Sequence, residues 1–186
     1  MNEVTWVQHI ASAVSAQQSF SQVGLSLRTG LKLAYGCEIQ SYGPEPLPQS
    51  ISFETDLAII ETIGEASWKP RVVVEAKLGS ITTHDAITYS QQASSHRAVH
   101  PYLRYGIILG NREHYPLPGR LYRHGAQFDF MISFRGTDPD ESEMAMFIEL
   151  LQAEVTASRT LEKILYESRQ KGRDHYTLLH RQLRVK

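Results

Sequence analysis

The sequence lacks the residues that several protein classes depend on. Its 186 residues include one cysteine, Cys37, so the chain has no internal disulfide and no cysteine cluster that could bind zinc. No apolar run approaches the ~18 residues of a membrane-spanning helix, and the first residues lack the basic and apolar regions of a secretory signal. We therefore expect a cytoplasmic protein that has no membrane partner.

Motifs of familiar enzyme classes are also missing. The chain has no GxGxxG or GxxxxGK[ST] motif for nucleotides and no GxSxG motif of a serine hydrolase. His96 and His100 have the i, i+4 spacing of half a zinc site, but no HExxH motif surrounds them and no third ligand is evident. We interpret them as exposed histidines of a helix.

The net charge is close to zero, at −1, but the charges are unevenly distributed along the chain. Residues 36–75 carry seven acidic and two basic side chains, whereas residues 159–186 carry eight basic and three acidic ones. Between these segments, Arg97, Arg104, Arg112, Arg120 and Arg123 form a second basic stretch. This pattern fits an acidic metal centre flanked by surfaces that bind a polyanion. The alternative for the C-terminal segment is an ordinary solvated helix face.

The order of the expected elements indicates an α/β fold with a mixed sheet flanked by helices, in a single domain spanning residues 1–186. Residues 4–34 are mostly compatible with helix, broken at two glycines, and a short strand over 37–41 precedes a proline-rich loop over 43–50. Strands are expected over 53–61, 70–78, 104–110 and 127–134, with an irregular loop over 112–125. A capping-box pattern, Thr82 with Asp85, predicts a helix up to Pro101, and a long amphipathic helix is expected over 142–169.

The segment VVVEAKLG, residues 72–79, places two charges in a run that is otherwise typical of a buried strand. Because alternate residues of a strand point to the same side, Glu75 and Lys77 emerge together. Burying them costs several kcal/mol unless they pair or hold an ion. A surface ion pair is the alternative, but it predicts alternating exposure, whereas the run of valines is continuous.

A second carboxylate comes from the preceding strand. The segment 53–61 carries Asp56 and is joined to the next strand by a short turn. Adjacent strands lie ~4.8 Å apart, so Asp56 and Glu75 can reach one cation. Two carboxylates, the backbone carbonyl of Ala76 and several waters would form the oxygen-rich octahedral site that Mg²⁺ prefers.

Asp56, followed by Glu75, Ala76 and Lys77 at the end of an apolar strand and then by a helix, resembles the PD-(D/E)xK nuclease superfamily. Thr55 stands where that motif has its proline. The resemblance implies a restriction-endonuclease-like αβββαβ core over about residues 6–110, extended by a further strand and a long helix over about 126–186. It also implies that Asp56 and Glu75 are metal ligands and that Lys77 is the catalytic lysine.

Three further positions resemble accessory features of some branches of the superfamily. Glu38 lies where several branches carry an additional acidic residue near the metal. Gln91 and Gln92 lie on the helix after the motif, where some branches place a glutamine that steadies the lysine or the substrate. The sequence does not decide between the two glutamines.

The resemblance implies a DNA endonuclease of the restriction or of the repair and recombination type, which uses Mg²⁺ or, in its place, Mn²⁺. Its products would carry a 5′-phosphate and a 3′-hydroxyl. We expect the DNA backbone to meet Arg112, Arg120 and Arg123, and we expect a homodimer or a separate recognition subunit, because the chain is short. The alternative is a non-catalytic relative that serves as a DNA-binding or assembly subunit of a larger complex.

Overall fold

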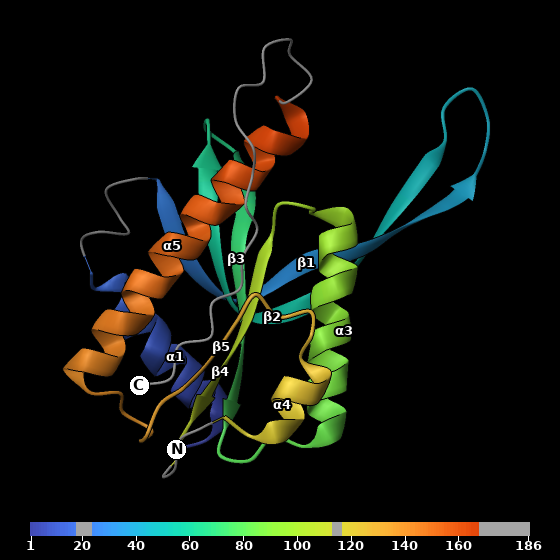
Figure 1. The fold of residues 1–186 in the computed structure, drawn as a ribbon. Helices are drawn as coiled ribbons and strands as arrows, with labels where there is room; N and C mark the ends of the chain where they lie inside the picture. Colours follow the sequence, from blue (N-terminus) through green and yellow to red (C-terminus); the bar gives the residue numbers. More distant parts are fainter. Residues whose placement is uncertain (18–23, 113–116, 168–186) are drawn as a thin grey trace.

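The computed structural model describes residues 1–17, 24–112 and 117–167 of the chain, and these form an α/β fold (Figure 1). A five-stranded mixed sheet in the order β1-β2-β3-β4-β5 lies between two layers of helices. The elements are α1 (Glu3–Ser15), β1 (Leu25–Ser41), β2 (Leu47–Ile63), β3 (Ser67–Leu78), α3 (Thr83–Val99), β4 (Arg104–Gly110), α4 (Gly119–His124), β5 (Phe130–Ser133) and α5 (Glu141–Tyr166). The expected mixed sheet with flanking helices is confirmed.

The direction of each strand follows from its connection. β1, β2 and β3 form an antiparallel meander joined by short turns. The long helix α3 carries the chain back across the sheet, so that β4 runs parallel to β3, and β5 is parallel to β4. From α1 to β4 the elements therefore follow the expected order αβββαβ.

Three expectations about local structure are wrong. The first helix ends at Ser15, and Leu25–Ser41 is a strand, paired with β2 from Leu25 opposite Glu61 to Ser41 opposite Leu47. The same pairing takes residues 47–50 out of the expected loop and into β2. The segment expected to be irregular contains the short helix α4, which buries Leu121. In the first two cases pairing between distant segments overrides the local preference of the chain.

Other expectations hold within a few residues. Thr82 and Asp85 form a complete capping box at the start of α3. A second capping box, Asp140 with Glu143, starts α5 one residue before the expected position, and α5 ends at Tyr166. Glu167 is its C-cap, whereas residues 168–169 of the predicted helix, and most of the basic C-terminal segment, lie outside the described residues.

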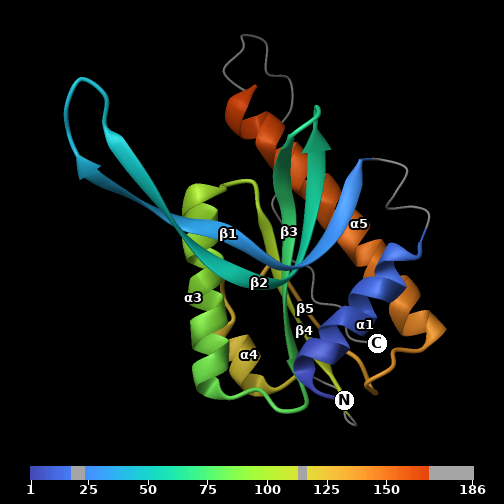
Figure 2. The same ribbon diagram turned by 180° about the vertical axis from the view of Figure 1, so that it is seen from behind.

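The two faces of the sheet carry separate cores. On one face, α1 and α5 pack against residues such as Leu57, Val72 and Val74, and on the other face α3 and α4 pack against residues such as Ala58, Val73 and Ile107. Figure 2 shows α1 and α5 together on one side of the strands and α3 and α4 on the other. Alternate residues of β2 and β3 thus belong to different cores.

Close packing of α1 on β4 fixes the start of α1 against the sheet. A Cβ on Gly110 would lie only 2.4 Å from the ring of Trp6, so only glycine allows this ring to sit on β4. The indole nitrogen of Trp6 also donates a hydrogen bond of 2.8 Å to the carbonyl of Thr137. As a result, the first turn of α1 is held beside the end of β3.

β2 separates from β3 at Asp56. The last residue pair between them is Leu57 with Val74, whereas β2 continues to pair with β1 up to Leu47. The far halves of β1 and β2 project away from the sheet as a two-stranded ribbon (Figures 1 and 2). We call the point where the strands separate, bounded by Asp56 and by residues 75–78, the β2–β3 fork.

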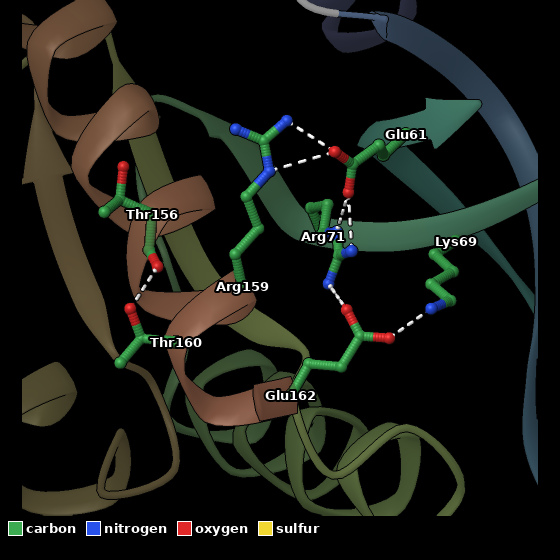
Figure 3. Close-up of polar contacts among 7 residues, drawn as sticks. All are labelled: Glu61, Lys69, Arg71, Thr156, Arg159, Thr160 and Glu162. Carbon is green, nitrogen blue, oxygen red and sulfur yellow. Dashed lines mark hydrogen bonds and ion pairs between the residues drawn. The ribbon is translucent and has the colours of Figure 1, made fainter. Parts of the chain in front are cut away.

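At the other end of β3, ion pairs attach the second half of α5 to the sheet (Figure 3). Arg71 is 4% exposed and contacts Glu61 on β2 through Nε at 2.6 Å and Glu162 on α5 through Nη1 at 2.7 Å. Arg159 also pairs with Glu61, and Lys69 pairs with Glu162. Breaking one partner of such a buried pair costs about 3–5 kcal/mol, because the remaining charge is left without compensation.

This network predicts a loss of stability in acid. Burial alone would raise the pKa values of Glu61 and Glu162, but hydrogen bonds from Arg159 and Arg71 to Glu61, and from Lys69 and Arg71 to Glu162, outweigh it and hold both pKa values below the ordinary value. Their contribution is therefore complete above the ordinary glutamate pKa of ~4.3 and is lost as the pH falls through the lowered folded-state values.

We expect Arg71→Met to lower the free energy of unfolding by about 3–5 kcal/mol at pH 7. The difference from wild type should shrink below about pH 4, where the two carboxylates become protonated. Urea titrations at pH 7 and below about pH 4 measure the free energy of unfolding of both proteins. Arg135→Met, which replaces an exposed arginine, is the control. A difference that is the same at both pH values would contradict this account.

Candidate active site

The sheet places Asp56 and Glu75 on the same face. Leu57 on β2 and Val74 and Ala76 on β3 pack against α1 and α5, so their neighbours Asp56, Glu75 and Lys77 point toward α3. The two acidic side chains are in hydrogen-bond contact with each other. The structure thus brings together Asp56 and Glu75, the two predicted metal ligands, at the β2–β3 fork.

Two carboxylates replace the hydrogen bonds that β3 loses at the fork. The amide of Ala76 donates to Asp56 Oδ2 at 2.8 Å, and the amide of Leu78 donates to Glu3 Oε2 at 3.1 Å. Buried amides rarely stay unpaired, so the departure of β2 is what gives these carboxylates their positions. The N–H and C=O of one strand residue point to the same edge, so the carbonyl of Ala76 faces the fork too.

Glu75 is buried at 5% exposure, and its Oε1 accepts a hydrogen bond from the hydroxyl of Tyr105. Burial, with the nearby charge of Asp56, raises the pKa of Glu75 to about 8. Burial also raises the pKa of Asp56. Two carboxyl groups this close share a proton at neutral pH unless a cation replaces it.

Lys77 is the third predicted residue at the fork, and two side chains hold it. Its Nζ lies 3.3 Å from Glu3 Oε1 and 5.9 Å from the centre of the Tyr89 ring. Burial alone would lower the pKa of Lys77, but Tyr89 and Glu3 outweigh it and raise the value. The amine is therefore a fixed positive charge at neutral pH.

Sequence reasoning missed three residues of this site: Glu3, Tyr89 and Tyr105. Glu3 had no signal, because an acidic residue in the first turn of a helix is already explained by the helix dipole. Tyr105 did have a signal in the sequence, since a tyrosine in the buried strand 104–110 needs a hydrogen-bond partner for its hydroxyl. Tyr89 lies on the α3 face that covers the fork.

The structure does not bring Glu38 to the site. Glu38 is exposed and pairs with Gln49 on the outer ribbon. On β1, the residue opposite Asp56 is Gly30, and Glu38 lies eight residues further along the strand. At ~3.3 Å per residue this is roughly 26 Å along the strand. Gln91 is exposed on α3, and Gln92 is half-buried on the same face as Tyr89, without a hydrogen bond to the acidic pair.

Two of the three predicted DNA-binding arginines contact the loop that follows Lys77. Arg120 Nη1 donates to the carbonyl of Ile81 at 2.7 Å, and Arg112 Nη1 donates to that of Gly79 at 3.4 Å. Arg123 is exposed on the neighbouring helix α4. Arg112, Arg120 and Arg123 therefore lie on the side of the site where β3 leads into α3.

The interpretation of His96 as an exposed residue is wrong. His96 is 0% exposed, and its Nδ1 lies 3.0 Å from the carbonyl of Ala34 on β1. Its ring is stacked on that of Tyr105, with centres 5.6 Å apart. α3 packs on the base of the ribbon, which local sequence could not reveal. His100 is half-buried at the end of α3.

No protein-family model matches the chain, and no curated protein matches its sequence. Within residues 1–17, 24–112 and 117–167, no three His, Cys, Asp or Glu side chains form a group that could hold a metal ion. No helix of this part of the chain is long and apolar enough to cross a membrane.

The shared proton predicts how the cation-free protein responds to pH. The pKa of Glu75 is raised from 4.5 to about 8, so its stabilising contribution is complete below the lower value and is lost as the pH rises to the higher one. In EDTA, we expect the free energy of unfolding to fall over this range, by at most about 1.4 kcal/mol per pH unit. Glu75→Gln, which does not titrate, should remove this fall.

Urea titrations from pH 5 to pH 9 measure the effect. The control is Glu65→Gln, which changes an exposed glutamate in the turn between β2 and β3 and should keep the wild-type pH profile. A Glu75→Gln protein with the wild-type profile would show that Glu75 is not the titrating group.

Proposed function

We propose that this protein is a Mg²⁺-dependent DNA endonuclease of the PD-(D/E)xK type. The observation that carries the proposal is the β2–β3 fork, where the buried carboxyl group of Glu75 and the half-buried one of Asp56 are in contact beside a fixed ammonium group. An ion pair alone would not need the second carboxyl group. The αβββαβ order of the elements supports the restriction-endonuclease-like core that the sequence motif implies.

The residues present fit a hard divalent cation. Asp56 and Glu75 would hold it, with the carbonyl of Ala76, and all three offer the oxygen ligands that Mg²⁺ and Mn²⁺ prefer. The raised pKa values of both acids show that the pair is unfavourable as two bare charges, which is the situation that a bound cation relieves. A bound Mg²⁺ would supply activation of the attacking water and neutralise charge on the phosphate.

The protein's own residues would then position the reacting groups. The ammonium of Lys77 would orient the attacking water and stabilise the charge that develops on the phosphate. Glu3 and Tyr89 keep that ammonium in place beside the acids. Cleavage of the bond from phosphorus to the 3′ oxygen would leave a 5′-phosphate and a 3′-hydroxyl.

DNA would approach from the side of the loop between β3 and α3. That loop follows β3, which carries Lys77, and its carbonyls accept hydrogen bonds from Arg112 and Arg120. Arg123 lies on α4, the same helix as Arg120. A duplex bound there would place a phosphate near the carboxyl pair. We further propose that the protein acts in the cytoplasm as a homodimer or beside a recognition subunit, because one domain offers a single site.

The alternative, a non-catalytic DNA-binding or assembly subunit, has one observation in its favour. In the described part of the chain only a pair of acidic residues, and no group of three, is placed to hold a metal. The placement of Lys77 beside that pair favours the enzyme, because a subunit that only binds DNA has no need of a half-buried lysine held between Glu3 and Tyr89.

We expect Lys77→Ala to reduce Mg²⁺-dependent cleavage of plasmid DNA by at least about 100-fold, the scale on which a group that stabilises transition-state charge contributes. Lys32→Ala, which removes an exposed lysine from β1, is the control and should keep wild-type activity. Circular dichroism should show both variants folded. Wild-type strand scission by Lys77→Ala would rule out the catalytic role.

Replacing Arg112, Arg120 and Arg123 by glutamine should weaken binding of a labelled duplex in EDTA. Each lost phosphate contact lowers the slope of log affinity against log salt by nearly one. Arg135→Gln with Lys163→Gln, which alters charges beside and on α5, is the control. Fluorescence anisotropy over a range of salt measures both, and a triple variant with the wild-type slope would show that these arginines do not contact the backbone.

A further inference from the structure

Tyr105 is the residue that connects the buried acid to the rest of the core. It pairs with Val73 in the parallel β3–β4 register, so its side chain lies on the same face as Glu75, two residues further along β3. A tyrosine is long enough to reach this diagonal neighbour. Its hydroxyl donates to Glu75 Oε1, and the residue itself is 0% exposed.

Asp129 fixes the backbone of Tyr105 through hydrogen bonds to both its amide and its carbonyl. The amide of Tyr105 donates to Asp129 Oδ2 at 2.8 Å, and the amide of Asp129 donates to the carbonyl of Tyr105 at 2.7 Å. The carboxylate of Asp129 is itself held by Arg97 and Arg104, each at 3.0 Å. Tyr105 therefore cannot shift along its strand without breaking several charged contacts.

The ring of Tyr105 is fixed as well. His96 is stacked on it at an interplanar angle of 24°. The Nδ1 of His96 must donate to the carbonyl of Ala34, because a carbonyl only accepts, and burial lowers the pKa of His96, so the imidazole is neutral. A neutral ring supports the tyrosine without placing a second cation beside the acidic pair.

As a result, each of the two predicted metal ligands, Asp56 and Glu75, has one carboxylate oxygen engaged by the protein. Glu75 Oε1 accepts from Tyr105, and Asp56 Oδ2 accepts from the amide of Ala76. Each acid is left with one oxygen, Oε2 or Oδ1, to offer to a cation. Ca²⁺ often takes both oxygens of a carboxylate and six to eight ligands in flexible geometry, whereas Mg²⁺ requires six ligands close to a regular octahedron.

We propose that Tyr105 is a positioning residue that makes the site select Mg²⁺ and Mn²⁺ over Ca²⁺, by restricting Glu75 to binding through a single oxygen. This inference rests on the proposed metal-dependent function. Tyr105 does not touch the substrate; it acts through Glu75. Loss of its hydroxyl frees Glu75 to turn and bind with both oxygens, which lowers the affinity for Mg²⁺ and not that for Ca²⁺.

The test is calorimetric titration of the full chain, stripped with EDTA, with MgCl₂, MnCl₂ and CaCl₂. Tyr105→Phe removes only the hydroxyl. Tyr102→Phe is the matched control, since Tyr102 is also buried, at 8% exposure, but lies against Arg71 and Tyr166 at the other end of the sheet. Melting temperatures without metal show that the variants fold.

We expect Tyr105→Phe to lose about 10- to 100-fold in affinity for Mg²⁺ and Mn²⁺, as typical for the loss of a residue that orients a metal ligand. Its Ca²⁺ affinity should be unchanged or higher, and Tyr102→Phe should match wild type. The proposal is overturned if Tyr105→Phe binds all three cations as wild type does, or if its affinities for all three fall by the same factor. Neither result contradicts the metal site of the wild-type protein.

Two further outcomes distinguish a failure of the proposed metal site from a failure of the proposed selectivity. Wild-type protein that binds none of the three cations overturns the metal site of the proposed function, and this inference with it. If Tyr105→Phe does not fold, the wild type still decides the matter, because binding of Ca²⁺ at least as tightly as Mg²⁺ contradicts the proposed selectivity.

Discussion

The site depends on one feature of the sheet, the separation of β2 from β3 at Asp56. Where the strands pair, their amides and carbonyls bond to each other, and no polar side chain is needed. Beyond the Leu57–Val74 pair, the edge of β3 would be left with buried donors, and the carboxylates of Asp56 and Glu3 take them. The same separation therefore gathers the acidic side chains of Asp56 and Glu3 at the edge of β3.

The rest of the molecule keeps this arrangement rigid from both faces. Trp6, seated on Gly110, holds the first turn of α1 and with it Glu3. On the opposite face, Tyr105 connects Glu75 to His96. The ion pairs around Arg71 attach α5 at the far end of the same strands. Two carboxyl groups in contact away from full solvation are costly, and these contacts, which lie outside the pair, supply the stability that permits it.

The sequence predicted the centre of the site because local rules determine it. Strand periodicity places Glu75 and Lys77 on one side of β3, and the short turn around Gly64 makes β2 its neighbour, which brings Asp56 close. The capping box at Thr82 is equally local. Glu3 and the burial of His96 could not be predicted, because each depends on contacts with residues more than 60 positions away in the chain. The strand conformation of residues 25–34 could not be predicted for the same reason, since pairing with β2 decides it.

We propose that the β2–β3 fork binds a divalent cation between the carboxylates of Asp56 and Glu75. Crystals of the protein grown or soaked with Mn²⁺ test it directly, because the anomalous signal locates the metal without assumptions about its ligands. We expect one strong peak in contact with Asp56, Glu75 and the carbonyl of Ala76, which disappears in crystals of Asp56→Asn. Crystals that show Mn²⁺ bound elsewhere, with Asp56 and Glu75 still in direct contact, would contradict it.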